Sequence, residues 1–366
     1  MKTTIVSLVL ALCSVAVYVA CSQEDDAFRF AEPGRGISLP ADHAAHPEYA
    51  TEWWYYTGHL RSKDGGRYGF QLTWFRVGLT AEQQAESKFK ARTVYFAHFT
   101  VTDKTGRTFR FAEKLSRGGS YDNAGADNRV LHTWLGDWKL EGLGSMFYMS
   151  AREDSMALSL IGIPRKPAVL QGENGYSRKG AAATNASMYY SMPRIAVTGV
   201  LTLDGTPIDV EGTAWMDHEF GTSQLDPGTI GWDWFSLQLD NGEELMVYGL
   251  RRADGSYDPR SSGALVLADG TKVPLAAGDF RIEVLERWRS PKSGATYPAK
   301  WRVSVPSQSL QATVTPYVAD QELRSENSVR ITYWEGAASV AATRNGASVT
   351  GEGYVELTGY AKPLSF

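Results

Sequence analysis

The sequence predicts an all-β protein built from two antiparallel β-barrel domains in tandem, with few short helices. Three observations support this prediction. Strand-like runs rich in aromatic and β-branched residues follow one another along most of the 366-residue chain. Turn dipeptides separate many of these runs, and one hairpin pattern occurs twice.

The strand-like runs alternate with dipeptides that favour tight turns between antiparallel strands. Representative runs are YGFQLTWFRV (68–77), TVYFAHFTVTD (93–103), IAVTGVLTL (195–203) and SVRITYWEG (328–336). The turn dipeptides are Asp64-Gly65, Asp204-Gly205, Asn241-Gly242, Asp254-Gly255, Asp269-Gly270 and Asn345-Gly346. Helical patterns are few, and the clearest candidate is a short surface insertion, TAEQQAESKFKA (80–91).

A repeated hairpin pattern indicates two similar domains. Residues 52–76 and 231–252 each run through paired tryptophans, a strand, an Asp-Gly or Asn-Gly turn, a second strand and an arginine. Trp54 corresponds to Trp234 in this comparison, and Arg76 corresponds to Arg251. We therefore expect the same hairpin once in each barrel, with the joint between the barrels inside 185–195. Closing each barrel would avoid an exposed sheet edge.

The N-terminal residues have the features of a targeting segment. Lys2 is followed by an almost wholly apolar stretch, 5–19, which is short for a membrane span and suited to a signal peptide. Ala20-Cys21 at its end resembles a bacterial lipoprotein processing site, although Tyr18 departs from the usual pattern. We expect a signal peptide over 1–20 and lipidation of Cys21.

The rest of the chain then divides into three parts. Residues 21–45, acidic and then interrupted by Gly and Pro, are expected to form a lipid-anchored tether that leads into the first domain. The N-terminal barrel is expected over 46–190 and the C-terminal barrel over 191–366. Lipidation would place the protein in the cell envelope, and Ser22 after the cysteine favours the outer membrane, facing the periplasm.

Charge and composition exclude several function classes. The formal net charge of −4 gives no reason to expect nucleic acid as a partner. The six histidines are scattered without a metal-ligand spacing, so no metal is expected. No Gly-rich phosphate loop has the strand–helix surroundings that nucleotide binding requires, and no cofactor is expected.

Several sequence motifs resemble those of the carotenoid 1,2-hydratase (hydroxyneurosporene synthase) and AttH-type family, and they occur in the same order along the chain as in that family. They include TEWWYYTGHL (51–60), FQLTWFR (70–76), GTAWMDHEFG (212–221), GWDWFSLQL (231–239) and SPKSGATYPAKW (290–301). The resemblance covers nearly all of 46–362 and implies two lipocalin-like domains in tandem. It implies several activities in different members: carotenoid hydration, partnership with ABC export systems, and acceleration of cycloadditions.

The stretch WMDHEFG (215–221) holds the candidate catalytic residues Asp217, His218 and Glu219 between aromatic side chains. Hydrating an isolated alkene requires a strong proton donor, which a carboxylic acid kept protonated by apolar surroundings can supply. In an extended strand, Asp217 and Glu219 would share one face and His218 would lie on the other. The alternative is that Asp217 and His218 close a buried polar network that orders the barrel end.

We expect an aromatic-lined ligand cavity around this stretch, close to the joint between the barrels. Arg76 and Arg251 favour pairing with a carboxylate, such as Glu52 or Asp233, over direct contact with substrate. The candidate ligand-binding residues are Trp53, Trp54, Tyr55, Arg76, Trp215, Trp232, Asp233, Trp234, Tyr248 and Arg251.

Two functions from different classes remain open at this point. The first is a membrane-tethered binding protein that holds a hydrophobic small molecule or lipid and serves an ABC-type export or envelope-lipid system, with a transporter permease as partner. The second is a lyase-type enzyme that hydrates an isoprenoid-like apolar substrate, or otherwise acts on it by acid catalysis.

Overall fold

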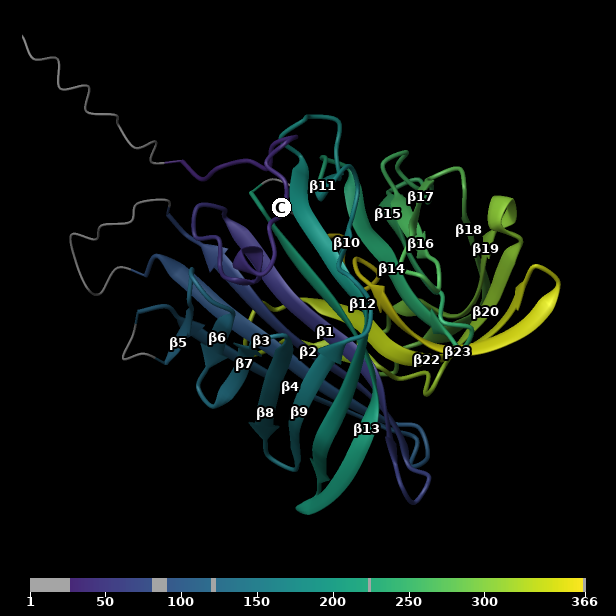
Figure 1. Ribbon diagram of the computed structural model, residues 1–366, viewed down its shortest axis with the longest axis horizontal. Coiled ribbons are helices and arrows are strands. Elements are labelled where there is room, and N and C mark those ends of the chain that lie inside the picture. The colour runs from purple at the N-terminus through teal and green to yellow at the C-terminus, as the bar shows by residue number, and fades with distance from the viewer. Residues whose placement is uncertain (1–26, 81–90, 120–122, 223–224, 365–366) are drawn as a thin grey trace, which may run out of the picture.

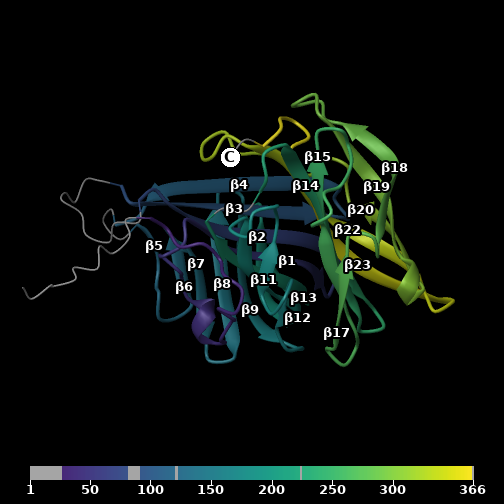
Figure 2. The ribbon, with the colours of Figure 1, turned by 90° about the horizontal axis from the view of Figure 1, so that it is seen from above.

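A computed structural model describes residues 27–80, 91–119, 123–222 and 225–364. The protein is all-β, with 62% of its residues in strands, as the sequence predicted. Two antiparallel sheets lie side by side, and the strands of one cross the outer face of the other (Figures 1 and 2). The first is a nearly closed, barrel-like sheet.

The first sheet has 13 strands. Along its edge-to-edge path they are β4 (Thr108–Arg117), β3 (Thr93–Asp103), β2 (Arg67–Gly78), β1 (Thr51–Ser62), β13 (Thr206–Gly221), β12 (Ala186–Leu203), β9 (Met156–Pro164), β8 (Met146–Glu153), β7 (Trp138–Leu143), β6 (His132–Leu135) and β5 (Ala124–Ala126). Two short strands, β10 (Val169–Leu170) and β11 (Tyr176–Arg178), also pair with β12.

The second sheet has 10 strands. Its path runs β17 (Lys272–Ala276), β16 (Ser262–Val266), β15 (Glu244–Arg252), β14 (Thr229–Leu239), β23 (Ala347–Leu357), β22 (Thr332–Arg344), β20 (Leu310–Pro316), β19 (Thr296–Val305) and β18 (Arg281–Arg289), and β21 (Glu322–Arg324) pairs with β22. Helical structure in the described ranges consists of two short 3₁₀ turns, η1 (Ala41–His43) and η2 (Pro306–Gln308). The expected helix at 80–91 falls almost wholly outside the described residues.

The repeated hairpin pattern is confirmed as β1–β2 in the first sheet and β14–β15 in the second. All six turn dipeptides lie in turns. At Asp204-Gly205 and Asn345-Gly346 both residues have positive φ, the conformation that a two-residue hairpin turn of type I′ requires.

The sheets do not divide where we expected. The expected joint at 185–195, and with it the proposed start of the second domain at residue 191, falls inside β12. Both β12 and β13 belong to the first sheet, where β13 pairs with β1 on one side and β12 on the other. The chain passes to the second sheet between Gly221 and Thr229. The stretch WMDHEFG therefore ends the first sheet and does not open the second.

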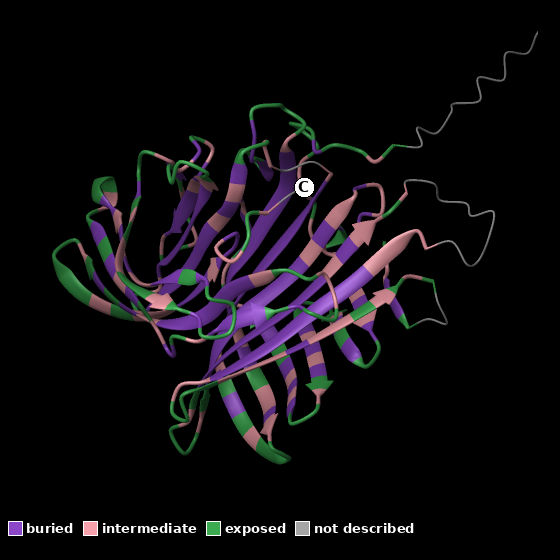
Figure 3. Ribbon diagram, turned by 180° about the vertical axis from the view of Figure 1, so that it is seen from behind, coloured by how far each residue is buried: buried purple, intermediate pink, exposed green. Residues whose placement is uncertain are grey.

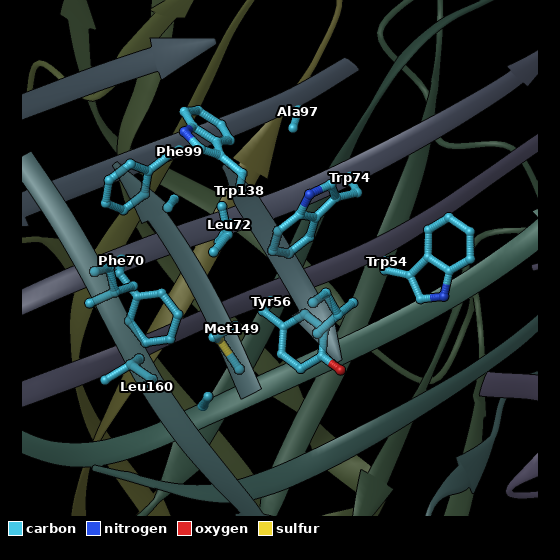
Figure 4. Close-up of a cluster of buried hydrophobic side chains, with 14 of the residues drawn as sticks. Trp54, Tyr56, Phe70, Leu72, Trp74, Ala97, Phe99, Trp138, Met149 and Leu160 are labelled. Atoms are coloured by element: carbon cyan, nitrogen blue, oxygen red, sulfur yellow. The ribbon is translucent and has the colours of Figure 1, made fainter. Parts of the chain in front are cut away.

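Strand β1 shows why four consecutive aromatic residues, 53–56, replace the usual alternation of polar and apolar residues. Trp54 and Tyr56 point into the core of the first barrel, shown in Figure 4, while Tyr55 belongs to a separate cluster between the two sheets. Successive side chains of a strand point to opposite faces. Both faces of β1 are buried because the second sheet covers the outer one, and Figure 3 shows this continuous burial in the central strands.

The described part of the expected tether lies against the barrel. Ala31, Asp42 and Ala44 are buried, and Ala45 contributes to the first core. Burial of the chain thus starts at Ala31, which precedes residue 46, the expected start of the first domain. No helix within the described ranges is both long enough and apolar enough to span a bilayer.

Candidate functional site

A cavity of about 450 Å³ lies between the two sheets. Strands β1, β2, β3, β12 and β13 form its wall on the first sheet, and β14, β15, β22 and β23 form its wall on the second. Most of the lining surface is apolar, and the aromatic side chains in it are Trp53, Tyr55, Phe75, Phe96, Tyr189, Trp232, Trp234 and Tyr248. A mainly apolar cavity with a few polar groups is the usual form of a small-molecule site.

The alternation of β13 decides which residues of WMDHEFG face the cavity. Asp217 and Glu219 line it, whereas His218 points to the opposite side of the sheet. On the neighbouring strand β1, Tyr55 stands opposite Asp217 and Trp54 stands opposite His218. The expected separation of the two acids from the histidine is therefore observed.

Asp217 is a buried acid held by three hydrogen-bond donors. Its Oδ2 accepts from the Tyr189 hydroxyl at 2.6 Å, and its Oδ1 accepts from Ser191 Oγ at 2.5 Å and from Trp215 Nε1 at 2.7 Å. Burial penalises the charged form and raises the pKa of Asp217 to about 7, although the three donors act to lower it. The side chain can therefore exist in both protonation states near neutral pH.

Two further acids, which the sequence analysis did not select, line the same cavity. Glu335 on β22 and Glu356 on β23 stand directly opposite each other in the sheet. Burial raises the pKa of Glu356 to about 7, against a hydrogen bond from Trp232 Nε1 at 3.1 Å. Burial, with added repulsion from Glu356, raises the pKa of Glu335 well above its usual range.

Glu219 is balanced by a cation. Lys179 Nζ lies 3.1 Å from Glu219 Oε1, and Ser187 Oγ donates to the same oxygen. The ammonium group also lies 4.3 Å from the centre of the Tyr248 ring and 4.8 Å from that of Tyr189. Although burial acts to lower the pKa of Lys179, attraction to the neighbouring Glu219 outweighs it, and the pKa of Lys179 is raised.

His218 belongs to a polar network that reaches the cavity only through Glu52 and Arg76. Its Nε2 lies 2.9 Å from Glu52 Oε1, which also contacts His46 Nδ1 at 2.7 Å, and Arg76 Nε donates to Glu52 Oε2 at 2.9 Å. The hydrogen bonds from these partners hold the pKa of Glu52 well below its usual range despite burial. This is the buried polar network that was the alternative interpretation for His218.

The same network contains a group with metal-ligand atoms. His46, Glu52 and His218 are such a group within the described residues. Both imidazole nitrogens, however, contact Glu52 directly at hydrogen-bond distance, and the Arg76 guanidinium supplies a positive charge beside it. The donor set is thus satisfied internally and does not fit a metal ion.

The remaining expected residues fall into three groups. Trp53, Tyr55, Arg76, Trp232, Trp234 and Tyr248 line the cavity. Trp215 belongs to the cluster between the sheets and donates a hydrogen bond to Asp217, and Trp54 stacks on His218 with ring centres 5.0 Å apart. Arg251 pairs with Asp233 at 3.0 Å in a separate network with Tyr257 and Tyr360. Both arginines therefore pair with the carboxylates that the sequence analysis suggested.

The fold and the cavity define a class: two antiparallel β-sheets enclosing an aromatic site that carries several carboxyl groups. The chain belongs to the AttH-like family, whose model matches residues 30–360. No curated protein matches the sequence.

Similar solved structures include the following three. A candidate AttH protein from Nitrosomonas europaea is 35% identical, with a TM-score of 0.82 over 91% of this chain and 100% of that one. Kievitone hydratase from Nectria haematococca is 14% identical, with a TM-score of 0.69 over 92% and 97% of the two chains. CghA, solved with Sch210972, is 14% identical, with a TM-score of 0.52 over 84% and 88%. The last two show a shared fold.

Proposed function

We propose that this protein binds an apolar small molecule or lipid in the cavity between its two sheets. The observation that carries the proposal is a cavity between the sheets whose lining surface is mostly apolar and aromatic, with charged side chains among its walls. Burying the lining and a ligand together would remove apolar surface from water, at roughly 25 cal/mol for each Å².

The biological setting in this proposal is the bacterial envelope. Cys21 would carry a lipid anchor on the periplasmic side of the outer membrane, and the bound molecule would pass to or from an ABC-type export system through a permease partner. The signal-peptide pattern before Cys21 supports the location.

Acid-catalysed hydration of an apolar substrate is the second candidate, and Asp217 is the observation that favours it. A carboxylic acid with a pKa near 7 can donate its proton to an alkene carbon, forming a carbocation and a carboxylate. The Trp234 and Tyr55 rings would stabilise the cation, by roughly 0.5–2 kcal/mol each. Water then adds, and the carboxylate takes up the proton that the water loses.

A pair of variants separates the two candidates. Trp234→Ala removes a cavity wall, whereas Asp217→Asn retains the shape of the side chain and removes the acid. For a binding protein, we expect Trp234→Ala to lose at least about tenfold in affinity for the molecule extracted with the native protein, or about 1.4 kcal/mol, while Asp217→Asn retains binding. For a hydratase, Asp217→Asn should bind and fail to turn over. If both folded variants bind and function like the wild type, the cavity is not the functional site.

A further inference from the structure

The cavity contains a pair of acids that no basic side chain of the described residues compensates. Glu335 and Glu356 are cross-strand neighbours on β22 and β23, and both line the cavity. Glu335 is 1% exposed, and its Oε1 atom has no hydrogen-bond partner among the described residues. An unsatisfied buried polar atom costs about 1–3 kcal/mol. A bound ligand that satisfied it would recover that cost.

The two neighbouring tyrosines do not satisfy this atom. The Tyr55 and Tyr333 hydroxyls are close enough to Glu335 to act against the rise in its pKa. Within the described residues, however, the Tyr55 hydroxyl has no hydrogen bond, and the Tyr333 hydroxyl contacts His98 Nδ1 at 2.7 Å. Glu356 accepts a hydrogen bond from Trp232, a neutral donor. The two carboxyl groups can therefore accept further hydrogen bonds from a ligand in the cavity.

The basic side chains that line the cavity are already engaged. Lys179 pairs with Glu219, and Arg76 pairs with Glu52 while also donating to the backbone carbonyls of His46 and Tyr49. Among the described residues, the ion pairs of these two cations are with Glu219 and Glu52, not with Glu335 or Glu356. The balance of charge in the lining thus favours a ligand that brings its own positive charge.

We propose that the molecule bound in this cavity is an apolar compound carrying a protonated amine, seated against the Glu335–Glu356 pair. This inference rests on the proposed binding function and specifies its ligand class. The ammonium group would donate to the two carboxylates, and the Tyr55, Trp232 and Trp234 rings lining the same cavity suit a cation and its hydrocarbon chain.

A metal ion fits this place less well than an organic cation. Within the described ranges, the ligand atoms that converge as a metal site requires are those of His46, Glu52 and His218, and the two acids are not among them. An alkylammonium ion instead spreads its contacts between carboxylates and aromatic faces, which is what the cavity wall presents.

Protonation provides a second line of support. Burial raises the pKa of Glu335 well above its usual range and raises the pKa of Glu356 to about 7. A cation bound beside them would favour their charged forms, so binding should release protons. The other titratable groups acting on the pair are Tyr55 and Tyr333 at Glu335, and Asp217 and Glu219 at Glu356.

The experiment compares three probes of equal chain length by isothermal titration calorimetry on the full mature protein. Decylamine carries a titratable cation, decyltrimethylammonium carries a permanent one, and decan-1-ol is neutral. Titrations at about pH 5.5 and 8, in buffers of different ionisation enthalpy, measure affinity and proton release.

We expect decylamine to bind at least about tenfold more tightly than decan-1-ol at the higher pH, which corresponds to about 1.4 kcal/mol. Its affinity should fall toward pH 5.5 and its binding should release protons. The variant Glu335→Gln/Glu356→Gln should lose most of this preference while retaining decan-1-ol binding. The exposed Glu286→Gln serves as the matched control and should leave the preference unchanged.

The possible failures are distinct. If decan-1-ol binds as well as both cationic probes at the two pH values, the amine proposal is overturned and the binding function stands. If none of the three probes binds the folded protein, both the proposed function and this inference are contradicted.

Discussion

Asp217 illustrates how the surroundings of one residue set its chemistry. Three donors point at its carboxylate, an arrangement that alone would make the acid stronger. Burial between the sheets outweighs them, so its pKa rises to about 7. The residue type and its strand position were readable from the sequence, but the burial depends on the second sheet.

The raised pKa of Asp217 has a consequence for stability. Between about pH 4 and 7 the folded protein holds a proton on Asp217 that the unfolded chain has released, so this residue lowers stability as pH rises through that window. We expect Asp217→Asn to flatten the pH dependence of the free energy of unfolding over that range. Urea denaturation at several pH values measures it, and an unchanged slope would contradict the assigned environment.

Glu52 should matter mainly for stability. Glu52→Gln would leave Arg76 buried without its anionic partner, and we expect a loss of about 3–5 kcal/mol in the free energy of unfolding. The matched control is Glu283→Gln, which removes an exposed partner of Arg302 and should cost less than about 1 kcal/mol. Similar losses in the two variants would show that the network around Glu52 does not stabilise the fold.

At the scale of elements, strand identity and hairpins could be predicted because they depend on local signals. The turn at Asn345-Gly346 and the alternation of Asp217 and His218 are properties of adjacent residues. The pairing of β13 with β1 joins segments far apart in the chain, and no local pattern assigns β12 and β13 to the first sheet. Glu335 and Glu356 were missed for the same reason, since they lie far apart from WMDHEFG in the chain and the cavity that brings them near Asp217 forms only where the two sheets meet.

Gly69 shows how closely the two sheets approach. It lies on β2, and a Cβ atom placed there would collide with the side chain of Ala337 on β22. We expect Gly69→Leu to push the sheets apart, weaken ligand binding and lower the melting temperature. The comparison is Gly65→Ala, where positive φ strains the turn but no atom lies within 4 Å. Equal binding by both variants would mean that close packing of the sheets is not needed for the cavity.

At the scale of the whole molecule, the predicted two-barrel organisation is present as two joined sheets, and the cavity exists only where they meet. Membership of the AttH-like family, which motifs spread over the chain had indicated, is confirmed. The division point between the sheets was not readable, because β12 and β13 look like any other hairpin until their neighbours are known.

Membrane attachment remains a prediction, since Cys21 lies outside the described residues. Labelled fatty acid should enter the wild-type protein in cells, and Cys21→Ser should remain unlabelled and leave the membrane fraction. Cys13→Ser, which changes the cysteine inside the signal segment, should label normally. Equal labelling of wild type and Cys21→Ser would contradict lipidation at this site.

The most direct test of the central claim is native mass spectrometry of the protein purified without detergent exchange. We predict a bound small molecule on the wild type and its loss from Val77→Trp, which places a large ring in the cavity lining. Val200→Trp, on β12 and outside that lining, should retain the molecule. An identical bound mass on all three folded proteins, or no bound mass on the wild type after exposure to cell lipid extract, would contradict a ligand site between the sheets.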